Sequence, residues 1–241
     1  CRRRAVDHCV EINRACWPSR IFRLETVLSL RFRHQGNPRL SLASPPGARY
    51  RERIQRHDLQ EDPAQLAAVA QFDRIHAALG APPATAGWWR RWHKPAPAST
   101  VPGLYLWGSV GRGKTMLVDI FCESLPPSLR RRQHFHSFMR EVHAELRALD
   151  GVADPLLSVA RQWAQRYKVL CLDEFHVTDI TDAMLLARLL RALLELGVVL
   201  ITTSNEHPDQ LYRGGLQRER FLPAIALLKS QLEVVELGGD T

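Results

Sequence analysis

The sequence predicts an α/β protein in which a five-stranded parallel sheet lies between two layers of helices. Three observations lead to this prediction. Short apolar runs, typical of buried strands, alternate with longer stretches of helical spacing. The first run, 103–107, leads into a glycine-rich phosphate-binding motif and then a helical pattern. Two further runs, 169–174 and 198–205, end in polar residues, as strands do where an open α/β sheet binds a ligand.

The elements are expected in a simple order. Asp62-Pro63 is an N-cap followed by proline and predicts a helix, with apolar residues then recurring on one face. Strands are expected at about 103–108, 132–138, 167–173, 197–204 and 231–237. Helices that cover the sheet are expected after the glycine-rich loop and at 140–149, 155–166 and 180–196.

The motif Gly108-Ser-Val-Gly-Arg-Gly-Lys-Thr115 matches G-x-x-x-x-G-K-[ST] at every fixed position. Its glycines let backbone N–H groups turn toward phosphates, and the helix N-terminus adds a positive dipole end. Lys114 is expected to reach the β- and γ-phosphates of ATP, and the Thr115 hydroxyl to ligate Mg²⁺. The expected nucleotide-binding residues are Gly108, Ser109, Val110, Gly111, Arg112, Gly113, Lys114, Thr115 and Met116.

Two carboxylates follow the buried run Val169-Leu-Cys-Leu. Asp173 is placed to hold Mg²⁺, directly or through water, and Glu174 to orient and deprotonate an attacking water. Asp-Glu after a strand is a weak signal alone, but here it follows the phosphate motif by about sixty residues. Because kinases and small GTPases commonly lack this glutamate, hydrolysis is favoured over transfer to a second substrate.

Polar residues also end the run that starts at Val198. In P-loop ATPases with an additional strand, a polar residue at this place senses the γ-phosphate, and Asn205 fits that role, with Thr203 or Ser204 as alternatives. The other interpretation is that Ser-Asn-Glu-His-Pro ends the strand and caps the next turn. Further on, Arg218 and Arg220 flank a carboxylate. Such arginines can reach a neighbouring subunit's site, although spacing alone favours a solvated or salt-bridged face.

Longer words of the sequence resemble the AFG-like ATPase family, which has a bacterial cell-division member and mitochondrial relatives. These words are Asp62-Pro-Ala-Gln-Leu-Ala-Ala-Val69, Gly103-Leu-Tyr-Leu-Trp-Gly, Gly111-Arg-Gly-Lys-Thr115, His134-Phe-His-Ser-Phe-Met139, Leu172-Asp-Glu-Phe175, Thr178-Asp-Ile-Thr-Asp-Ala-Met-Leu-Leu186, Thr203-Ser-Asn205 and Leu211-Tyr-Arg-Gly-Gly-Leu-Gln-Arg-Glu-Arg-Phe-Leu-Pro-Ala-Ile225. The resemblance covers roughly residues 45 to 241. It implies a three-layer P-loop NTPase core of the AAA+ type, with strand order 5-1-4-3-2. It also implies ATP hydrolysis with Mg²⁺ in a homo-oligomeric ring or partial ring, whose arginine finger, Arg220 ahead of Arg218, acts in trans.

Three segments are expected along the chain. Residues 1–43 are Arg-rich, match no family pattern and are expected to be mobile; 44–102 form an N-terminal helix and a linker arm; and 103–241 form the ATPase core. Family members continue into a helical lid, so the resemblance implies that this chain stops before its lid.

Three smaller features have two interpretations each. By the resemblance Gln65 would contact adenine, whereas a surface position is favoured. The aromatics and arginines of Trp88–Trp92 could stack on bases, but anchoring of the arm is favoured. His134 and His136 are expected on one strand face, where two histidines without a third ligand favour a structural or substrate-facing role over metal binding.

Composition and charge narrow the class of protein. No run of eighteen apolar residues is free of charge, so no transmembrane segment is expected. The five cysteines form no C-x-x-C pair, which favours buried thiols in a reducing cytoplasm over disulfides or zinc. Residues 1–43 carry nine arginines and three acidic residues (+6) of the total charge of +8, which leaves +2 for the remainder. A nucleic-acid partner is therefore disfavoured.

The favoured function is an oligomeric bacterial ATPase that remodels a protein partner. The resemblance implies the division protein FtsZ as that partner, with peripheral association at the inner membrane. The alternatives are a replication-type AAA+ loader that acts on nucleic acid and a nucleotide-binding module without turnover.

Overall fold

The structure is a computed structural model and describes residues 42–81 and 101–238. The expected mobility of residues 1–43 and the Trp88–Trp92 cluster concern residues that lie, apart from 42 and 43, outside this description. The described residues contain five strands: β1 (Gly103–Trp107), β2 (Arg130–His134), β3 (Val169–Asp173), β4 (Val199–Ser204) and β5 (Leu232–Glu236). All pairings are parallel, and the order β2-β3-β4-β1-β5 confirms the predicted 5-1-4-3-2.

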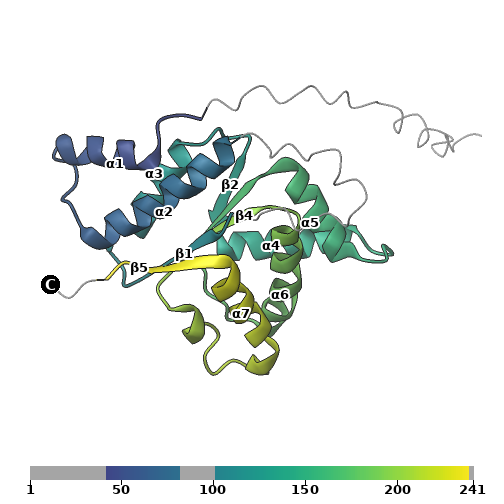
Figure 1. The fold of residues 1–241 in the computed structure, drawn as a ribbon. Coiled ribbons are helices and arrows are strands. Elements are labelled where there is room, and N and C mark those ends of the chain that lie inside the picture. The colour runs from purple at the N-terminus through teal and green to yellow at the C-terminus, as the bar shows by residue number, and fades with distance from the viewer. Residues whose placement is uncertain (1–41, 82–100, 239–241) are drawn as a thin grey trace, which may run out of the picture. The chain divides into compact units, whose positions relative to one another are not determined.

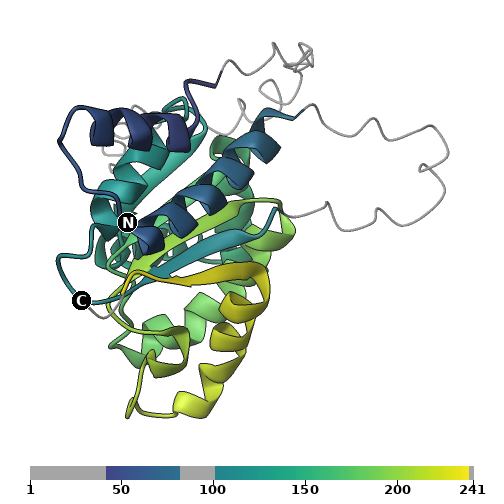
Figure 2. The same ribbon diagram turned by 60° about the vertical axis from the view of Figure 1, so that its left-hand side comes forward.

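Helices cover both faces of the sheet (Figures 1 and 2). On one face lie α1 (Pro46–Gln55), α2 (Pro63–Gly80) and α3 (Lys114–Glu123). On the other lie α4 (Phe135–Ala148), α5 (Pro155–Arg166), α6 (Ile180–Glu195) and α7 (Leu222–Gln231). Strands alternate their side chains between the faces, so Leu104 and Cys171 pack toward the first layer while Tyr105 and Leu172 pack toward the second. Burial on both faces explains the continuous apolar runs.

The helix predicted from Asp62-Pro63 is confirmed as α2. The Asp62 side chain accepts hydrogen bonds from the backbone N–H groups of Ala64 and Gln65 and so caps the helix. The Phe72 ring stacks on Phe121 of α3 at 4.6 Å between centroids. This contact joins α2 to the helix that follows the phosphate-binding loop.

The predicted strand 132–138 is wrong in its second half, because α4 begins directly after His134. Phe135, Phe138, Met139 and Val142 recur at helical spacing and are all buried, so this segment packs one face of a helix against the sheet. His134 therefore ends β2 while His136 lies on α4, and they do not share a strand face. Within the described ranges, no three His, Cys, Asp or Glu side chains gather to hold a metal.

Two 3-10 helices, η2 (Pro208–Gln210) and η3 (Arg218–Arg220), lie between β4 and α7. None of the helices that the structure describes is long and apolar enough to cross a membrane.

Candidate nucleotide-binding site

The loop between β1 and α3 has a backbone that only glycine adopts easily. Gly113 is the N-cap of α3 and has a φ of +85°. A side chain there would be strained and would meet the Gln65 amide nitrogen at 2.9 Å. At Gly108, with a φ of +148°, a Cβ atom would lie 2.4 Å from the Leu237 carbonyl oxygen. The motif's glycines thus allow a tight loop at the N-terminus of a helix, an arrangement that suits phosphate.

Lys114 is held inside this loop. Its Nζ donates hydrogen bonds to the carbonyl oxygens of Gly108 (2.6 Å) and Ser109 (2.9 Å). Burial lowers the pKa of the Lys114 ammonium from its usual value. Both acceptors of the Lys114 ammonium are neutral carbonyl oxygens of the loop, so neither of them neutralises its charge.

A cavity of about 360 Å³ lies beside the loop. It brings most of the predicted site residues together from β1–α3, β3 and β4. Its lining comprises Val110, Gly111, Arg112, Gly113, Lys114, Thr115, Met116, Glu174, Thr203, Ser204 and Asn205. Gly108 and Ser109 are not part of this lining, but their carbonyl oxygens accept hydrogen bonds from Lys114. The cavity thus lies at the carboxyl ends of the strands, as expected for an open α/β sheet.

Asp173 precedes the cavity residue Glu174 and is almost completely buried, with 6% of the residue exposed. Its Oδ2 accepts a hydrogen bond from Arg132 Nε at 2.6 Å, and its Oδ1 accepts one from the Thr203 hydroxyl at 3.4 Å. The carboxylate of Asp173 is therefore oriented by both neighbouring strands. A hydroxyl at Thr115 and a carboxylate at Asp173 are hard oxygen donors of the kind that Mg²⁺ prefers, so the residues fit this metal.

Glu174 contrasts with Asp173 because its side chain is 79% exposed. Its backbone has a φ of +55°, the left-handed region that favours glycine. Its N–H donates to the Thr203 hydroxyl at 3.1 Å, and its Oε2 lies 3.5 Å from His134 Nδ1. The carboxylate can thus reach a water in the cavity while its backbone is held by β4.

The three candidate γ-phosphate sensors at the end of β4 differ in their surroundings. Thr203 contacts Asp173 and Glu174, and the Ser204 hydroxyl donates to the Phe175 carbonyl at 2.9 Å. All three residues line the cavity, but Thr203 and Ser204 are buried, whereas Asn205 is exposed. Of the three, Asn205 is the side chain best placed to meet a ligand.

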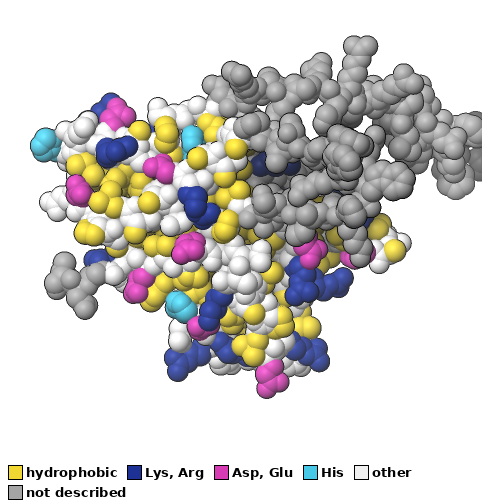
Figure 3. Space-filling model, in the orientation of Figure 1, with side chains coloured by type: hydrophobic (Ala, Val, Ile, Leu, Met, Phe, Trp, Pro, Cys, Tyr) yellow, Lys and Arg dark blue, Asp and Glu magenta, His cyan; other side chains and the backbone are white. Residues whose placement is uncertain are grey.

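Arg218 and Arg220 are not among the residues that line this cavity, since both belong to η3. Arg218 Nη2 donates to the Asp209 carbonyl at 2.6 Å, and the Asp209 carboxylate pairs with Lys229 at 2.9 Å. Arg220 is exposed. Figure 3 shows Lys and Arg side chains along the lower end of the view, over α6, α7 and the segment that contains η3.

Three residues of the site were not assigned these contacts by sequence reasoning. Arg132 pairs with Asp173, and His134 lies beside Glu174. Gln65 is half-buried: its Nε2 donates to the Arg112 carbonyl at 3.3 Å and its Oε1 accepts from the Tyr50 hydroxyl at 3.0 Å, and its contact with adenine stays a prediction. For Arg132 and His134 a signal did exist, because they alternate along one strand beside the Asp-Glu strand.

Comparison with known proteins supports the same kind of site. Residues 44–241 match the family model described as AFG1-like ATPase. Over 202 residues the chain is 46% identical to the cell division protein ZapE of Escherichia coli strain K12. The aligned region covers 80% of this chain and 54% of that protein. The chain thus spans about half the length of this relative.

Solved structures share the fold. DnaI matches with a TM-score of 0.50 at 18% identity, over 75% of this chain and 88% of that one. DnaA from Aquifex aeolicus, bound to AMPPCP, matches with a TM-score of 0.52 at 15% identity, over 76% of this chain and 50% of that one. At such identities the likeness shows the fold alone.

Proposed function

Because the chain belongs to the AFG1-like ATPase family, we propose that it binds ATP at the loop 108–115 and hydrolyses it with Mg²⁺. The observation that supports this most is the convergence of Lys114, Glu174 and Asn205 on one cavity at the carboxyl edge of the sheet. These side chains come from three different elements. Their meeting at one place is what phosphate transfer to water requires.

Each residue has a distinct role in the proposed reaction. Lys114 contacts the β- and γ-phosphates, and the N–H groups at the start of α3 receive the phosphate oxygens. Thr115 and Asp173 would hold Mg²⁺, which would neutralise charge that develops on those oxygens. Glu174 orients a water and accepts its proton, and Asn205 contacts the γ-phosphate or the attacking water.

The proposal needs a cation that reaches the γ-phosphate from a second subunit. Arg220 is our choice for this arginine finger, because it is exposed on η3 while Arg218 is hydrogen-bonded to its own chain. A homo-oligomer, a ring or partial ring, follows from that assignment.

The energy of hydrolysis is proposed to remodel a protein partner in the bacterial cytoplasm. The similarity to a cell division protein supports a partner from the division apparatus, and FtsZ at the inner membrane is the partner that the family resemblance implies. The described residues offer no observation that favours a nucleic-acid partner. The likeness to DnaI and DnaA does not supply one, because it shows the fold alone.

The test is steady-state ATP hydrolysis by the 241-residue chain over a series of protein concentrations. Glu174→Gln is the blank, since it keeps the shape of the side chain but cannot accept a proton. We expect specific activity to rise with concentration and the blank to bind ATP without turnover. Turnover by Glu174→Gln equal to that of the unaltered chain would show that Glu174 is not the base.

A further inference from the structure

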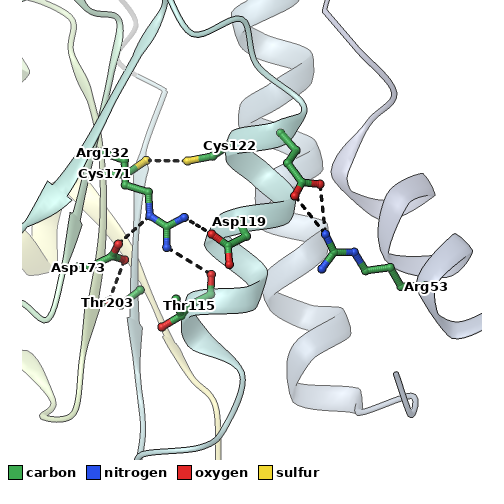
Figure 4. Close-up of polar contacts among 9 residues, drawn as sticks. Arg53, Thr115, Asp119, Cys122, Arg132, Cys171, Asp173 and Thr203 are labelled. Atoms are coloured by element: carbon green, nitrogen blue, oxygen red, sulfur yellow. Dashed lines mark hydrogen bonds and ion pairs between the residues drawn. The ribbon is translucent and has the colours of Figure 1, made fainter. Parts of the chain in front are cut away.

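One guanidinium with no role in the proposed reaction joins both halves of the metal site. Arg132, on the edge strand β2, donates from Nε to Asp173 of β3 at 2.6 Å. From its other two nitrogens it donates to the Asp119 carboxylate and, at 3.5 Å, to the Thr115 carbonyl oxygen of α3. Figure 4 shows the guanidinium between β3 and α3, with its three nitrogens directed at these acceptors.

The register of β2 explains how the side chain reaches this place. Arg132 lies opposite Cys171, two residues before Asp173, so all three side chains point to one face of the sheet. On that face the Cys171 Sγ atom lies 3.7 Å from Cys122 Sγ of α3. The guanidinium is therefore directed at the helix that starts at the phosphate-binding loop.

The charges around Arg132 require its presence. Its side chain is 20% exposed and that of Asp173 only 9%, while Asp119 supplies a second carboxylate to the same cation. Burial alone would lower the pKa of Arg132, but the hydrogen bonds to Asp119 and Asp173 outweigh it and raise the pKa above its usual range. The guanidinium thus stays charged, and among the described residues it is the ion-pair partner of both carboxylates.

The orientation of the Asp173 carboxylate depends on two hydrogen-bond donors. Arg132 binds one carboxylate oxygen and the Thr203 hydroxyl binds the other. Each carboxylate oxygen can accept a further hydrogen bond, which leaves Asp173 able to accept one from metal-bound water. We propose that Arg132 is a positioning residue that fixes the Asp173 carboxylate relative to Thr115 and thereby sets the affinity for Mg²⁺ with nucleotide. This inference rests on the proposed function, because it concerns the same metal site.

The preceding residue provides a matched control. Arg131 points to the opposite face, forms an ion pair with Glu141 and lies over the Trp163 ring at 5.4 Å. Its side chain is 24% exposed, close to the 20% of Arg132. If both arginines only support the fold, replacing either will lower stability without changing the dependence on Mg²⁺.

The experiment measures equilibrium binding of a fluorescent ADP analogue to the full chain, in EDTA and with Mg²⁺ titrated. For Arg132→Gln we expect unchanged affinity in EDTA and a Mg²⁺ requirement raised by about 10–100-fold, the usual effect of losing a partner of a metal ligand. Arg132→Lys keeps the charge but cannot span both carboxylates, so it should fall between. Arg131→Gln should keep the Mg²⁺ dependence of the unaltered chain.

Thermal unfolding identifies variants that fail to fold. If Arg132→Gln is among them, Arg132→Lys carries the test, since its ammonium still compensates the buried carboxylate. A folded Arg132 variant with the Mg²⁺ dependence of the unaltered chain would overturn the positioning role and leave the proposed function intact. No Mg²⁺-dependent nucleotide binding by the unaltered chain would overturn both.

Discussion

Single residues at the carboxyl edge of the sheet meet conformational as well as chemical demands. Glu174 adopts a φ of +55°, although a side chain in the left-handed region costs about 1–2 kcal/mol. The conformation is held by the hydrogen bond from its N–H to Thr203 and by the buried Asp173 just before it. Glu174 lines the cavity, while the carboxylate of Asp173 is buried and hydrogen-bonded to Arg132 and Thr203. Strain at this residue therefore separates two adjacent carboxylates with different proposed roles.

Replacing Glu174 by glycine should stabilise the protein and remove its activity. Glycine relieves the left-handed strain but gains entropy when unfolded, so we expect a net rise of about 0.5–1 kcal/mol in the free energy of unfolding. Chemical denaturation measures this change, and Glu174→Gln, which retains the strain, is the control. A glycine variant that is less stable than the glutamine variant by about 0.4–1 kcal/mol, the cost of the entropy alone, would show that the backbone at this residue is not strained.

At the scale of elements, the helices that sequence reasoning predicted well are those with a capping aspartate. Asp62, Asp154 and Asp179 each accept backbone N–H groups at the start of α2, α5 and α6. The strand β2 could not be bounded in this way, because Arg-Arg-Arg-Gln-His contains no apolar residue and its end is set by the helix that follows. Helix α1 was not predicted either, because its sequence is largely polar. The helix is stabilised by the packing of side chains such as that of Tyr50, which is fully buried.

The cap of α6 should make stability depend on pH. Hydrogen bonds from the Thr181 side chain and from the backbone N–H groups of Thr181 and Asp182 lower the pKa of the exposed Asp179 in the folded state. A lowered pKa means that Asp179 stabilises the fold above its unfolded value, about 3.9, and that this contribution is lost as pH falls through the folded value. Asn caps as well but does not titrate. We therefore expect the stability difference between the unaltered chain and Asp179→Asn, measured by urea denaturation, to shrink toward low pH; a constant difference would contradict the assignment.

At the scale of the whole molecule, the strand order was predicted from the family resemblance, and the site's location from the rule that open α/β sheets bind ligands at the carboxyl ends of their strands. The phosphate-binding loop and the Asp-Glu pair have fixed spacings, so their residues were predicted one by one. Contacts between distant elements have no such signal. Gln65 and Arg112 are 47 residues apart, and their pairing follows from no periodicity. For Arg132, which is 41 residues from Asp173, the only signal is the alternation of side chains along β2. The proposed arginine finger, Arg220, would act on the site of a neighbouring subunit, so no contact within one chain indicates it.

Mixing two inactive variants tests that second chain. Arg220→Ala should lower turnover without weakening nucleotide binding, and Lys114→Ala should lose binding. In a mixture, the Arg220→Ala subunit retains an intact loop and can receive Arg220 from its Lys114→Ala neighbour, so ATP hydrolysis should recover. Arg213→Ala, in the same segment but outside η3, is the control and should stay active. Loss of nucleotide binding by Arg220→Ala would indicate a folding role instead.

The contact of Gln65 with the phosphate-binding loop has a consequence for how this protein can be divided. Tyr50 holds the Gln65 amide, which in turn fills the space beside Gly113 and binds the Arg112 carbonyl. Phe72 of α2 covers Phe121, so the helix that follows the loop has its apolar back against the N-terminal pair of helices. A fragment that begins at β1 would keep every residue of the nucleotide motif but lose α1 and α2, which pack against the loop and α3. We therefore expect the shortest fragment that keeps this nucleotide site intact to begin at α1, more than fifty residues before the phosphate-binding motif.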